Sequence, residues 1–299
     1  MPGFVGVDAG GSKTIAAYAR DEGVVRTHCG EGANPRVRGV EAAADAIASA
    51  IAGALAGERA DALAVGAAGA GSAAMRDALA LALAQRFPDA RIGVSDDAHI
   101  ALRAVVPHGD GIVLVAGTGA LAYAEIAERR LRAGGYGYLL GEEGSGFAIG
   151  AAALRRLLHA FDGRVKSDAL LDALRERLPA RSAQDVVAAV YERAMPVGEI
   201  AACAPLVLEH AARGVRSATV IVQDAAKALF ELLRSVVTSL EEKDVTLAFS
   251  GGLLRENNLL TYLLDLRIAN EFPHLATVKG GADPYLGALA DARRLLARA

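Results

Sequence analysis

Residues 6–14, with the sequence GVDAGGSKT, decide the fold of this chain because a buried strand runs directly into a glycine turn. The apolar run before the turn predicts the strand, which ends at Asp8. Gly10 and Gly11 place backbone N–H groups at the strand end without a bulky side chain, so an anion can approach closely. A single turn of this kind is weak evidence, since a glycine pair after a strand is most often only a turn.

Two common phosphate-binding motifs do not fit this turn. A Walker A motif needs glycine directly before its lysine, whereas here Ser12 separates Gly11 from Lys13. A dinucleotide-binding fingerprint needs the spacing GxGxxG, which neither this turn nor GAAGAG at 66–71 supplies. Both interpretations are excluded by spacing alone.

The pattern of a strand followed by a glycine turn with a small hydroxyl residue occurs again at 112–118 and at 246–252. One copy could be an ordinary turn, but three copies in one chain are much harder to dismiss. We therefore expect three turns that face a phosphate group or a nucleotide.

The composition excludes several classes of protein. A length of 299 residues allows one large domain or two ordinary ones, and a formal net charge of −3 with no basic block argues against a nucleic-acid partner. Cys29 and Cys203 stand alone, which argues against a disulfide scaffold, a zinc site or an iron–sulfur cluster. No apolar run reaches the length of a membrane span and no signal peptide is evident, so we expect a cytoplasmic protein with no membrane partner.

Strand and helix signals alternate along the first third of the chain. They predict two strands joined by a turn at Asp21–Gly23, a helix over 38–56 and another helix that ends at Phe87. A short strand that begins at Arg91 then leads into an acidic turn at Asp96 and the start of a further helix.

A second α/β unit is predicted to begin near Gly109. Its first strands flank a Gly-Thr-Gly turn, and Ser145 is placed to cap a helix over 145–161. The pattern from 166 to 240 is mostly helical, and Pro284 stands near the start of the last helix. The longest helix is expected to bury a stripe made of Val220, Leu229, Leu232, Leu233, Val236 and Leu240.

Seven motifs, spread from end to end of the chain, carry a family resemblance. They are GVDAGGSKT, GANP at 32–35, SDDAHIAL at 95–102, LVAGTGALAY at 114–123, GGYGYLLGEEGSGFAIG at 134–150, FSGGLL at 249–254 and DPYLGAL at 283–289. In this order they resemble the N-acetylglucosamine kinase and BadF/BadG/BcrA/BcrD ATPase family of the actin-like ATPase and sugar kinase superfamily. The segment at 134–150 is the most specific, because generic actin-like proteins lack it.

The resemblance implies an α/β fold with two domains of the actin-like ATPase, ribonuclease H-like type, and an active site in the cleft between them. We expect an N-terminal domain over 1–109, with the C-terminal helix at 284–299 packed back on it, and a C-terminal domain over 110–283 that carries a helical insert.

The implied activity is an ATP- and Mg²⁺-dependent kinase that phosphorylates the 6-hydroxyl of N-acetylglucosamine or a related hexosamine, and the implied assembly is a homodimer. A glucosamine or N-acetylmuramic acid kinase of the same family stays an alternative, and a non-catalytic regulator that binds sugar and ATP is a more remote one. An ATP-driven electron-transfer activator is disfavoured because the cysteines for its iron–sulfur cluster are missing.

The resemblance assigns the general base to Asp97, in the position where these kinases place the aspartate that accepts the proton of the sugar hydroxyl. Orientation matters more than basicity for this role, since the proton leaves late in a loose transition state. Either Asp96 or Asp97 could instead be only the N-cap of the following helix. Asp8, at the end of the first strand, is the candidate ligand of Mg²⁺.

The three turns supply the expected nucleotide contacts, which are Gly10, Gly11, Ser12, Lys13, Thr14, Gly117, Thr118, Gly119, Gly251 and Gly252. Lys13 is expected to be solvated, because the turn acts through its backbone. The expected sugar contacts are Asn34, Asp97, Gly135, Tyr136, Gly137 and Glu142. Glu142 and Tyr136 stand where the family commonly has aspartate and tryptophan, and His99 is expected to be structural.

Overall fold

The computed structural model describes residues 1–20, 23–127, 129–240, 244–279 and 282–297. The chain divides into two compact units, of which unit 1 comprises residues 1–111 and 281–299 and unit 2 comprises residues 112–280. Asp21 and Glu22, where a hairpin turn was expected, lie outside the described residues.

Unit 1 is built on a mixed sheet in which three adjacent strands run parallel. Its order is β3 (Gly23–Glu31), β2 (Lys13–Arg20), β1 (Gly3–Ala9), β4 (Ala62–Ala67) and β5 (Arg91–Asp96). The β1–β2 and β2–β3 pairs are antiparallel, whereas β1, β4 and β5 run parallel to one another. The parallel strands therefore end at a common edge, which is where ligands bind in sheets of this kind.

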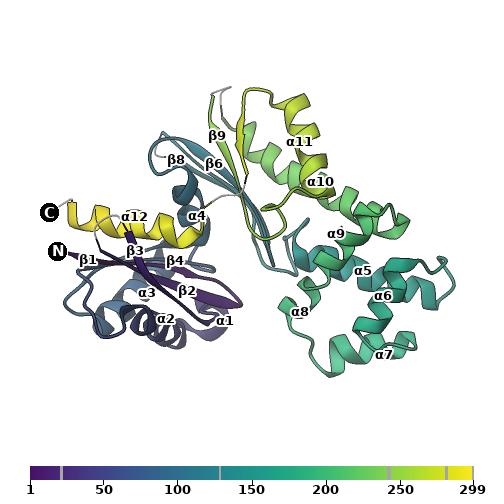
Figure 1. Ribbon diagram of the computed structural model, residues 1–299, viewed down its shortest axis with the longest axis horizontal. Helices are drawn as coiled ribbons and strands as arrows, with labels where there is room; N and C mark the ends of the chain where they lie inside the picture. The colour runs from purple at the N-terminus through teal and green to yellow at the C-terminus, as the bar shows by residue number, and fades with distance from the viewer. Residues whose placement is uncertain (21–22, 128, 241–243, 280–281, 298–299) are drawn as a thin grey trace. The chain divides into compact units, whose positions relative to one another are not determined.

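Helices cover both faces of this sheet (Figure 1). On one face lie α2 (Val40–Leu55) and α3 (Ala73–Arg86), and on the other lies α12 (Pro284–Ala297), which also packs against α4 (Asp97–Val105). The start of α12 at Pro284 confirms the expected helix start. The helix predicted over 38–56 is confirmed as α2, which begins after Gly39, whose φ of 82° separates it from α1 (Pro35–Arg38).

Two glycines bring α12 close to its neighbours. A Cβ atom on Gly6 of β1 would lie 2.5 Å from the backbone oxygen of Tyr285, and one on Gly287 would lie 2.1 Å from the backbone oxygen of Ile100 in α4. No real Cβ atom is tolerated at such distances, so the helix axis can approach β1 and α4 only because both side chains are missing. Small and apolar residues, including Ala292 at 0% exposure, fill the remaining contact.

Unit 2 repeats the strand order of unit 1. Its sheet has the order β10 (Ala276–Val278), β9 (Thr246–Ser250), β6 (Gly111–Ala116), β7 (Ala120–Ile126) and β8 (Arg129–Gly134). In both sheets the first strand is central, the next two lie on one side of it, and the last two lie on the other. The sequence did not predict β8 and β10, because both lie at an edge of the sheet and have mostly exposed or half-exposed residues.

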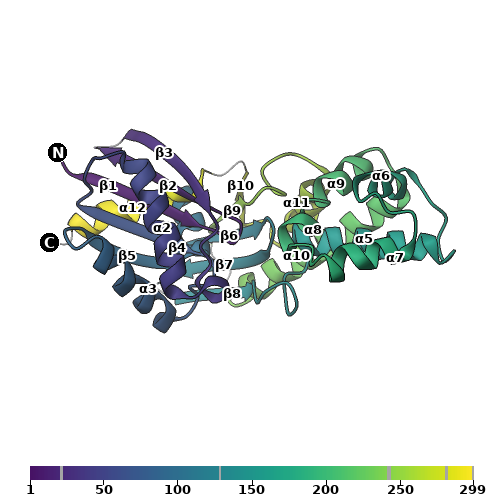
Figure 2. The same ribbon diagram turned by 90° about the horizontal axis from the view of Figure 1, so that it is seen from below.

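The helices of unit 2 are α5 (Gly146–Phe161), α6 (Ala169–Arg177), α7 (Ala183–Val187) with a π-helical turn at Ala188–Glu192, α8 (Val197–Ala201), α9 (Ala204–Ala212), α10 (Arg216–Val237) and α11 (Leu259–Glu271). In both views α6 and α7 lie at the end of the unit away from its sheet (Figures 1 and 2).

Two predictions about these helices have different outcomes. Ser145 caps α5 by accepting a hydrogen bond of 3.1 Å from the backbone N–H of Ala148, as the sequence predicted. The stripe expected on α10 is wrong at Val220, which is 40% exposed while Leu229 is fully buried. Nine residues of helix rotate a side chain by about two and a half turns, so these two residues lie on opposite faces.

Within the part of the chain that the structure describes, no helix has both the length and the apolar character that a membrane crossing requires.

The close approach at Gly287 gives a stability test. We expect Gly287→Ala to lower the free energy of unfolding by about 1–3 kcal/mol, because overpacking against the backbone of α4 outweighs the better helix propensity of alanine. Leu286→Ala, at an exposed position of the same helix, serves as the control and should change it by less than about 0.5 kcal/mol. Urea titrations followed by circular dichroism measure both, and an unchanged midpoint for Gly287→Ala would contradict the close packing.

Candidate active site

The carboxyl ends of β1, β4 and β5 bring two aspartates of unit 1 to one edge of its sheet. Asp8 pairs in register with Gly66, and Ala67 pairs with Asp96, so β4 alone separates the strands that end beside Asp8 and Asp97. Neighbouring strands lie about 4.8 Å apart, which puts β1 and β5 about 10 Å from each other. A phosphoryl group and the hydroxyl that accepts it can be held side by side over such a span.

The turn between β1 and β2 is closed by its own backbone. The N–H of Gly10 donates to the carbonyl of Lys13 at 2.9 Å, and the carbonyl of Gly10 accepts from Ala33 at 2.9 Å. Gly11, Ser12 and Lys13 are exposed, and nothing lies within 4 Å of a Cβ atom placed on Gly11. The turn therefore presents an open backbone surface, as an anion site requires.

Lys13 and Thr14 differ in where their side chains lie. The Lys13 side chain is exposed, in agreement with the expected solvated lysine. Thr14 is 0% exposed, and its hydroxyl has no hydrogen-bond partner among the described residues. The predicted contact between the Thr14 hydroxyl and a nucleotide stays a prediction.

Asn34 is held between two loops of unit 1. Its side-chain oxygen accepts from the backbone N–H of Arg36 at 2.9 Å and caps α1. The same oxygen would lie 2.3 Å from a Cβ atom on Gly69, whose φ is 87°, so the turn at 68–71 can pass Asn34 only with glycine there. Because the oxygen acts as a cap, the amide nitrogen of Asn34 is the group best able to contact a sugar hydroxyl.

The structure separates the roles of Asp96 and Asp97. The carboxylate of Asp96 is 8% exposed and accepts from the backbone N–H of His99 at 2.7 Å, which makes it the N-cap of α4. Asp97 is the first residue of that helix and is partly buried. Capping therefore falls to Asp96, and the assignment of Asp97 as the base stays a prediction.

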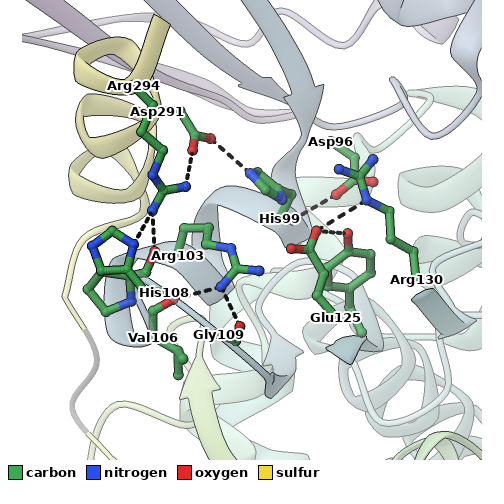
Figure 3. A network of polar contacts seen from close by, with 12 residues as sticks. Asp96, His99, Arg103, Val106, His108, Gly109, Glu125, Arg130, Asp291 and Arg294 are labelled. Carbon is green, nitrogen blue, oxygen red and sulfur yellow. Dashed lines mark hydrogen bonds and ion pairs between the residues drawn. The ribbon is translucent and has the colours of Figure 1, made fainter. Parts of the chain in front are cut away.

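A polar network ties α4, the helix that Asp97 begins, to α12 (Figure 3). Nε2 of His99 donates to Asp291 at 2.8 Å, and Asp291 accepts at 3.0 Å from Arg294, which also donates to the carbonyl of Pro107. These contacts support the structural role that was expected for His99. They also make the position of Asp97 depend on a helix close to the end of the chain.

At the other end of α4, Arg103 closes the loop that leaves the helix. It is 9% exposed and donates to the carbonyls of Val106 and Gly109 at 3.1 and 2.9 Å (Figure 3). A buried guanidinium that is satisfied by backbone oxygens fixes this loop.

In unit 2 the Gly-Thr-Gly turn is packed against the start of α5. The N–H of Gly117 donates to the carbonyl of Gly119 at 2.9 Å, and the turn carbonyls of Gly117 and Thr118 accept from Gly146 and Phe147 at 2.8 and 3.2 Å. With its carbonyls bonded to α5, the turn is fixed in position beside the N-terminus of that helix.

The C-terminal glycine turn lies beside the end of β6. A Cβ atom on Gly251, whose φ is 90°, would lie 2.3 Å from the carbonyl oxygen of Ala116, and that oxygen accepts from Leu253 at 3.1 Å. Nothing lies within 4 Å of a Cβ atom on Gly252, which is exposed. The two turns thus flank the same strand end, with Gly252 open to a ligand.

The loop at 134–142 follows β8 and contacts the Gly-Thr-Gly turn. Gly137 has a φ of 98°, and the carbonyl of Gly137 accepts from Gly141 at 3.0 Å, while Tyr136 is 63% exposed. A carboxylate oxygen of Glu142 lies 2.7 Å from the position of a Cβ atom on Gly119. Glu142 is therefore adjacent to an expected nucleotide turn, and its contact with a sugar stays a prediction.

Each unit gathers its own share of the predicted residues. Unit 1 contains Asp8, Gly10, Gly11, Ser12, Lys13, Thr14, Asn34 and Asp97, and unit 2 contains Gly117, Thr118, Gly119, Gly135, Tyr136, Gly137, Glu142, Gly251 and Gly252. The sequence reasoning missed Asp291, which lies 192 residues from its partner His99, and also Arg36 and Arg76, which contact the turn at 68–71. The separations of 192 residues between His99 and Asp291 and of 33 residues between Arg36 and Gly69 leave no local signal.

The neighbouring glycines at 251 and 252 form a matched pair for mutation. Gly251→Ala should lower stability by more than about 1 kcal/mol, because alanine is strained at that φ and clashes with β6. Gly252→Ala should fold like the unchanged protein but bind ATP about tenfold more weakly, since a methyl group would cover the backbone that we expect to face the nucleotide. Thermal unfolding and nucleotide titration separate the two effects, and full ATP affinity in Gly252→Ala would contradict the predicted contact.

Comparison with known proteins gives relatives along most of the chain. The sequence pattern of the BadF/BadG/BcrA/BcrD ATPase family matches residues 5–292. An N-acetylmuramic acid/N-acetylglucosamine kinase of Clostridium acetobutylicum is 30% identical over 206 residues, which are 68% of this chain and 67% of that protein. An N-acetyl-D-glucosamine kinase of Dictyostelium discoideum is 32% identical over 183 residues, 60% of this chain and 57% of the relative, so the match spans less than two thirds of that protein.

A crystal structure from Chromobacterium violaceum, provisionally named N-acetylglucosamine kinase, has a TM-score of 0.78 and 24% identity, and the match covers 97% of this chain and 98% of that one. Its likeness confirms the predicted α/β fold of the actin-like ATPase type. The resemblance found in the sequence is also confirmed, and the chain belongs to the BadF/BadG/BcrA/BcrD ATPase family.

Proposed function

We propose that the protein transfers the γ-phosphoryl group of ATP to the 6-hydroxyl of N-acetylglucosamine or a related hexosamine. The observation that carries this proposal is the common strand edge of unit 1, where the open turn at 10–14, Asp8, Asn34 and Asp97 lie together. The relatives bear out the prediction of an ATP-dependent sugar kinase. The acceptor hydroxyl and the residue roles below are our proposals.

The nucleotide is held mainly by backbone groups. Membership of an ATPase family implies the use of ATP. Gly11, Gly117 and Gly252 each have open space where a Cβ atom would lie, and open backbone of this kind at a strand end suits phosphate oxygens.

Asp8 is the proposed ligand of Mg²⁺. No cluster of three or more His, Cys, Asp or Glu side chains suited to a metal occurs among the described residues. Asp8 offers a single carboxylate, which suits Mg²⁺ because this ion is commonly held by one or two carboxylates together with substrate phosphates. When bound, the ion neutralises charge on the phosphate oxygens, and Asp8 holds it at the end of β1 beside the turn.

Asp97 is the proposed general base. As the 6-hydroxyl oxygen forms its bond to the γ-phosphorus, the bond from phosphorus to the bridging oxygen breaks and ADP leaves with that electron pair. The carboxylate of Asp97 takes the hydroxyl proton, while Asp96 serves as the N-cap of α4. The amide of Asn34 and the loop with Gly135, Tyr136 and Glu142 orient the sugar.

The alternative functions differ from this proposal either in the sugar that accepts the phosphoryl group or in having no catalytic activity. Glucosamine and N-acetylmuramic acid are alternative acceptors within the same mechanism, and a non-catalytic regulator would bind sugar and ATP without turnover. Assembly as a homodimer and a cytoplasmic location stay predictions, of which sedimentation velocity measures the first.

A panel of acceptors tests the proposal. Coupled release of ADP should be seen with at least one of glucosamine, N-acetylglucosamine and N-acetylmuramic acid in the presence of ATP and Mg²⁺, and it should be slower with glucose. Bound nucleotide without turnover on any hexosamine would favour the regulator instead.

Two neighbouring aspartates test the assignment of the base. Asp97→Asn should lower kcat by about a hundredfold to ten-thousandfold, the usual contribution of a general base, while ATP still binds. Asp96→Asn is the matched control, because asparagine is as good an N-cap as aspartate, and kcat should fall by less than about threefold. Nucleotide titration together with single-turnover rates gives both quantities, and near-normal turnover of Asp97→Asn would remove Asp97 from this role.

A further inference from the structure

Two arginines of unit 1 are held by one turn. Nε of Arg36 donates to the carbonyl of Gly69 at 3.0 Å, and Nη1 of Arg76 donates to the carbonyls of Ala70 and Gly71 at 3.2 and 2.9 Å. Three consecutive carbonyls thus fix two guanidinium groups that are 40 positions apart in the sequence. The two positively charged guanidinium groups lie at the same turn because its backbone carbonyls accept hydrogen bonds from both.

Arg36 and Arg76 differ from the nearby Arg38, which forms an ion pair with a glutamate. Arg38 donates to Glu31 at 2.8 Å, and this hydrogen bond raises the pKa of Arg38 and lowers the pKa of Glu31. Within the described residues, neither Arg36 nor Arg76 has an acidic partner. A guanidinium carries five N–H donors, so Nη1 and Nη2 of Arg36 and Nε and Nη2 of Arg76 keep donors for a ligand.

The pair lies next to the residue that we propose to contact the sugar. The backbone N–H of Arg36 donates to the side-chain oxygen of Asn34, and the turn that holds both guanidinium groups passes that oxygen at Gly69. The Cγ atom of Arg36 lies 3.3 Å from the position of a Cβ atom on Gly69. Asn34, Arg36 and the turn therefore form one packed cluster.

We infer that Arg36 and Arg76 form an anion subsite beside Asn34, which takes a carboxylate carried by the amino sugar. Planar guanidinium groups bind a carboxylate through paired charge-assisted hydrogen bonds. The substrate class is then a hexosamine with an acidic ether substituent, of which N-acetylmuramic acid is the available example. This inference rests on the proposed function, and it names the acceptor for which the site is built.

A phosphate of the nucleotide is the other source of an anion in this reaction. The turn at 10–14 also lies close to the segment that leads into Asn34, because a Cβ atom on Gly32 would lie 2.1 Å from the carbonyl oxygen of Gly11. The experiment must therefore separate a loss of affinity for the sugar carboxylate from a loss of affinity for ATP.

Charge-neutral variants provide the test. For Arg36→Gln and Arg76→Gln, the ratio of KM for N-acetylmuramic acid to KM for N-acetylglucosamine should rise about tenfold, since each loses a charge-assisted hydrogen bond. Arg38→Gln is the matched control, because its charge is already paired with Glu31, and the ratio should change by less than about twofold. An unchanged ratio in both variants, or a rise in KM for ATP in its place, would overturn the inference.

Calorimetric titration with N-acetylmuramic acid tests this inference separately from the proposed kinase function. Turnover of N-acetylglucosamine without any binding of N-acetylmuramic acid overturns the anion subsite and leaves the kinase proposal standing. If no hexosamine is phosphorylated, the kinase proposal fails, and titration of N-acetylmuramic acid into the unchanged protein and the two glutamine variants still decides the subsite. Binding through the arginines should weaken as salt rises, and this dependence should shrink in both variants.

Discussion

The direct packing of α12 on β1 and α4 is the constraint on which unit 1 depends. Gly6 and Gly287 have no side chains, so a helix from the end of the chain reaches the central strand and the helix that begins at Asp97. The bond between His99 and Asp291 fixes the same pair of helices through a polar contact. Asp97, the proposed base, is therefore positioned by residues that take no part in the chemistry. One of them is Gly287, which lets α12 approach the helix that Asp97 begins.

The repeated strand order explains why glycine turns occur where they do. In each sheet the first strand is central and is followed by a turn, at Gly10 in unit 1 and at Gly117 in unit 2. In unit 2 the carbonyl oxygen of Ala116 also accepts from Leu253, so the third turn lies against the same strand end. Strand ends of this kind leave backbone N–H groups without sheet partners, and phosphate oxygens can satisfy them.

Much of the site could be predicted from local patterns, because each turn is encoded within about ten residues. The GVDAGGSKT turn, the strand that ends at Asp96 and the Ser145 cap are all of this type. The stripe predicted on α10 is wrong at Val220, because the helical period puts Val220 and Leu229 on opposite faces of the helix. The edge strands β8 and β10 were missed because exposed strands have no apolar alternation to reveal them.

The sequence by itself determined the family, the fold type and the segments that carry the glycine turns, since these depend on short motifs in a fixed order. Only the tertiary structure decided which aspartate caps α4, which residue partners His99, and that Arg36 and Arg76 meet at one turn. The physical reason is distance along the chain. A hydrogen bond between residues 33 or 192 positions apart forms only after folding has brought their segments together, and no local pattern records it.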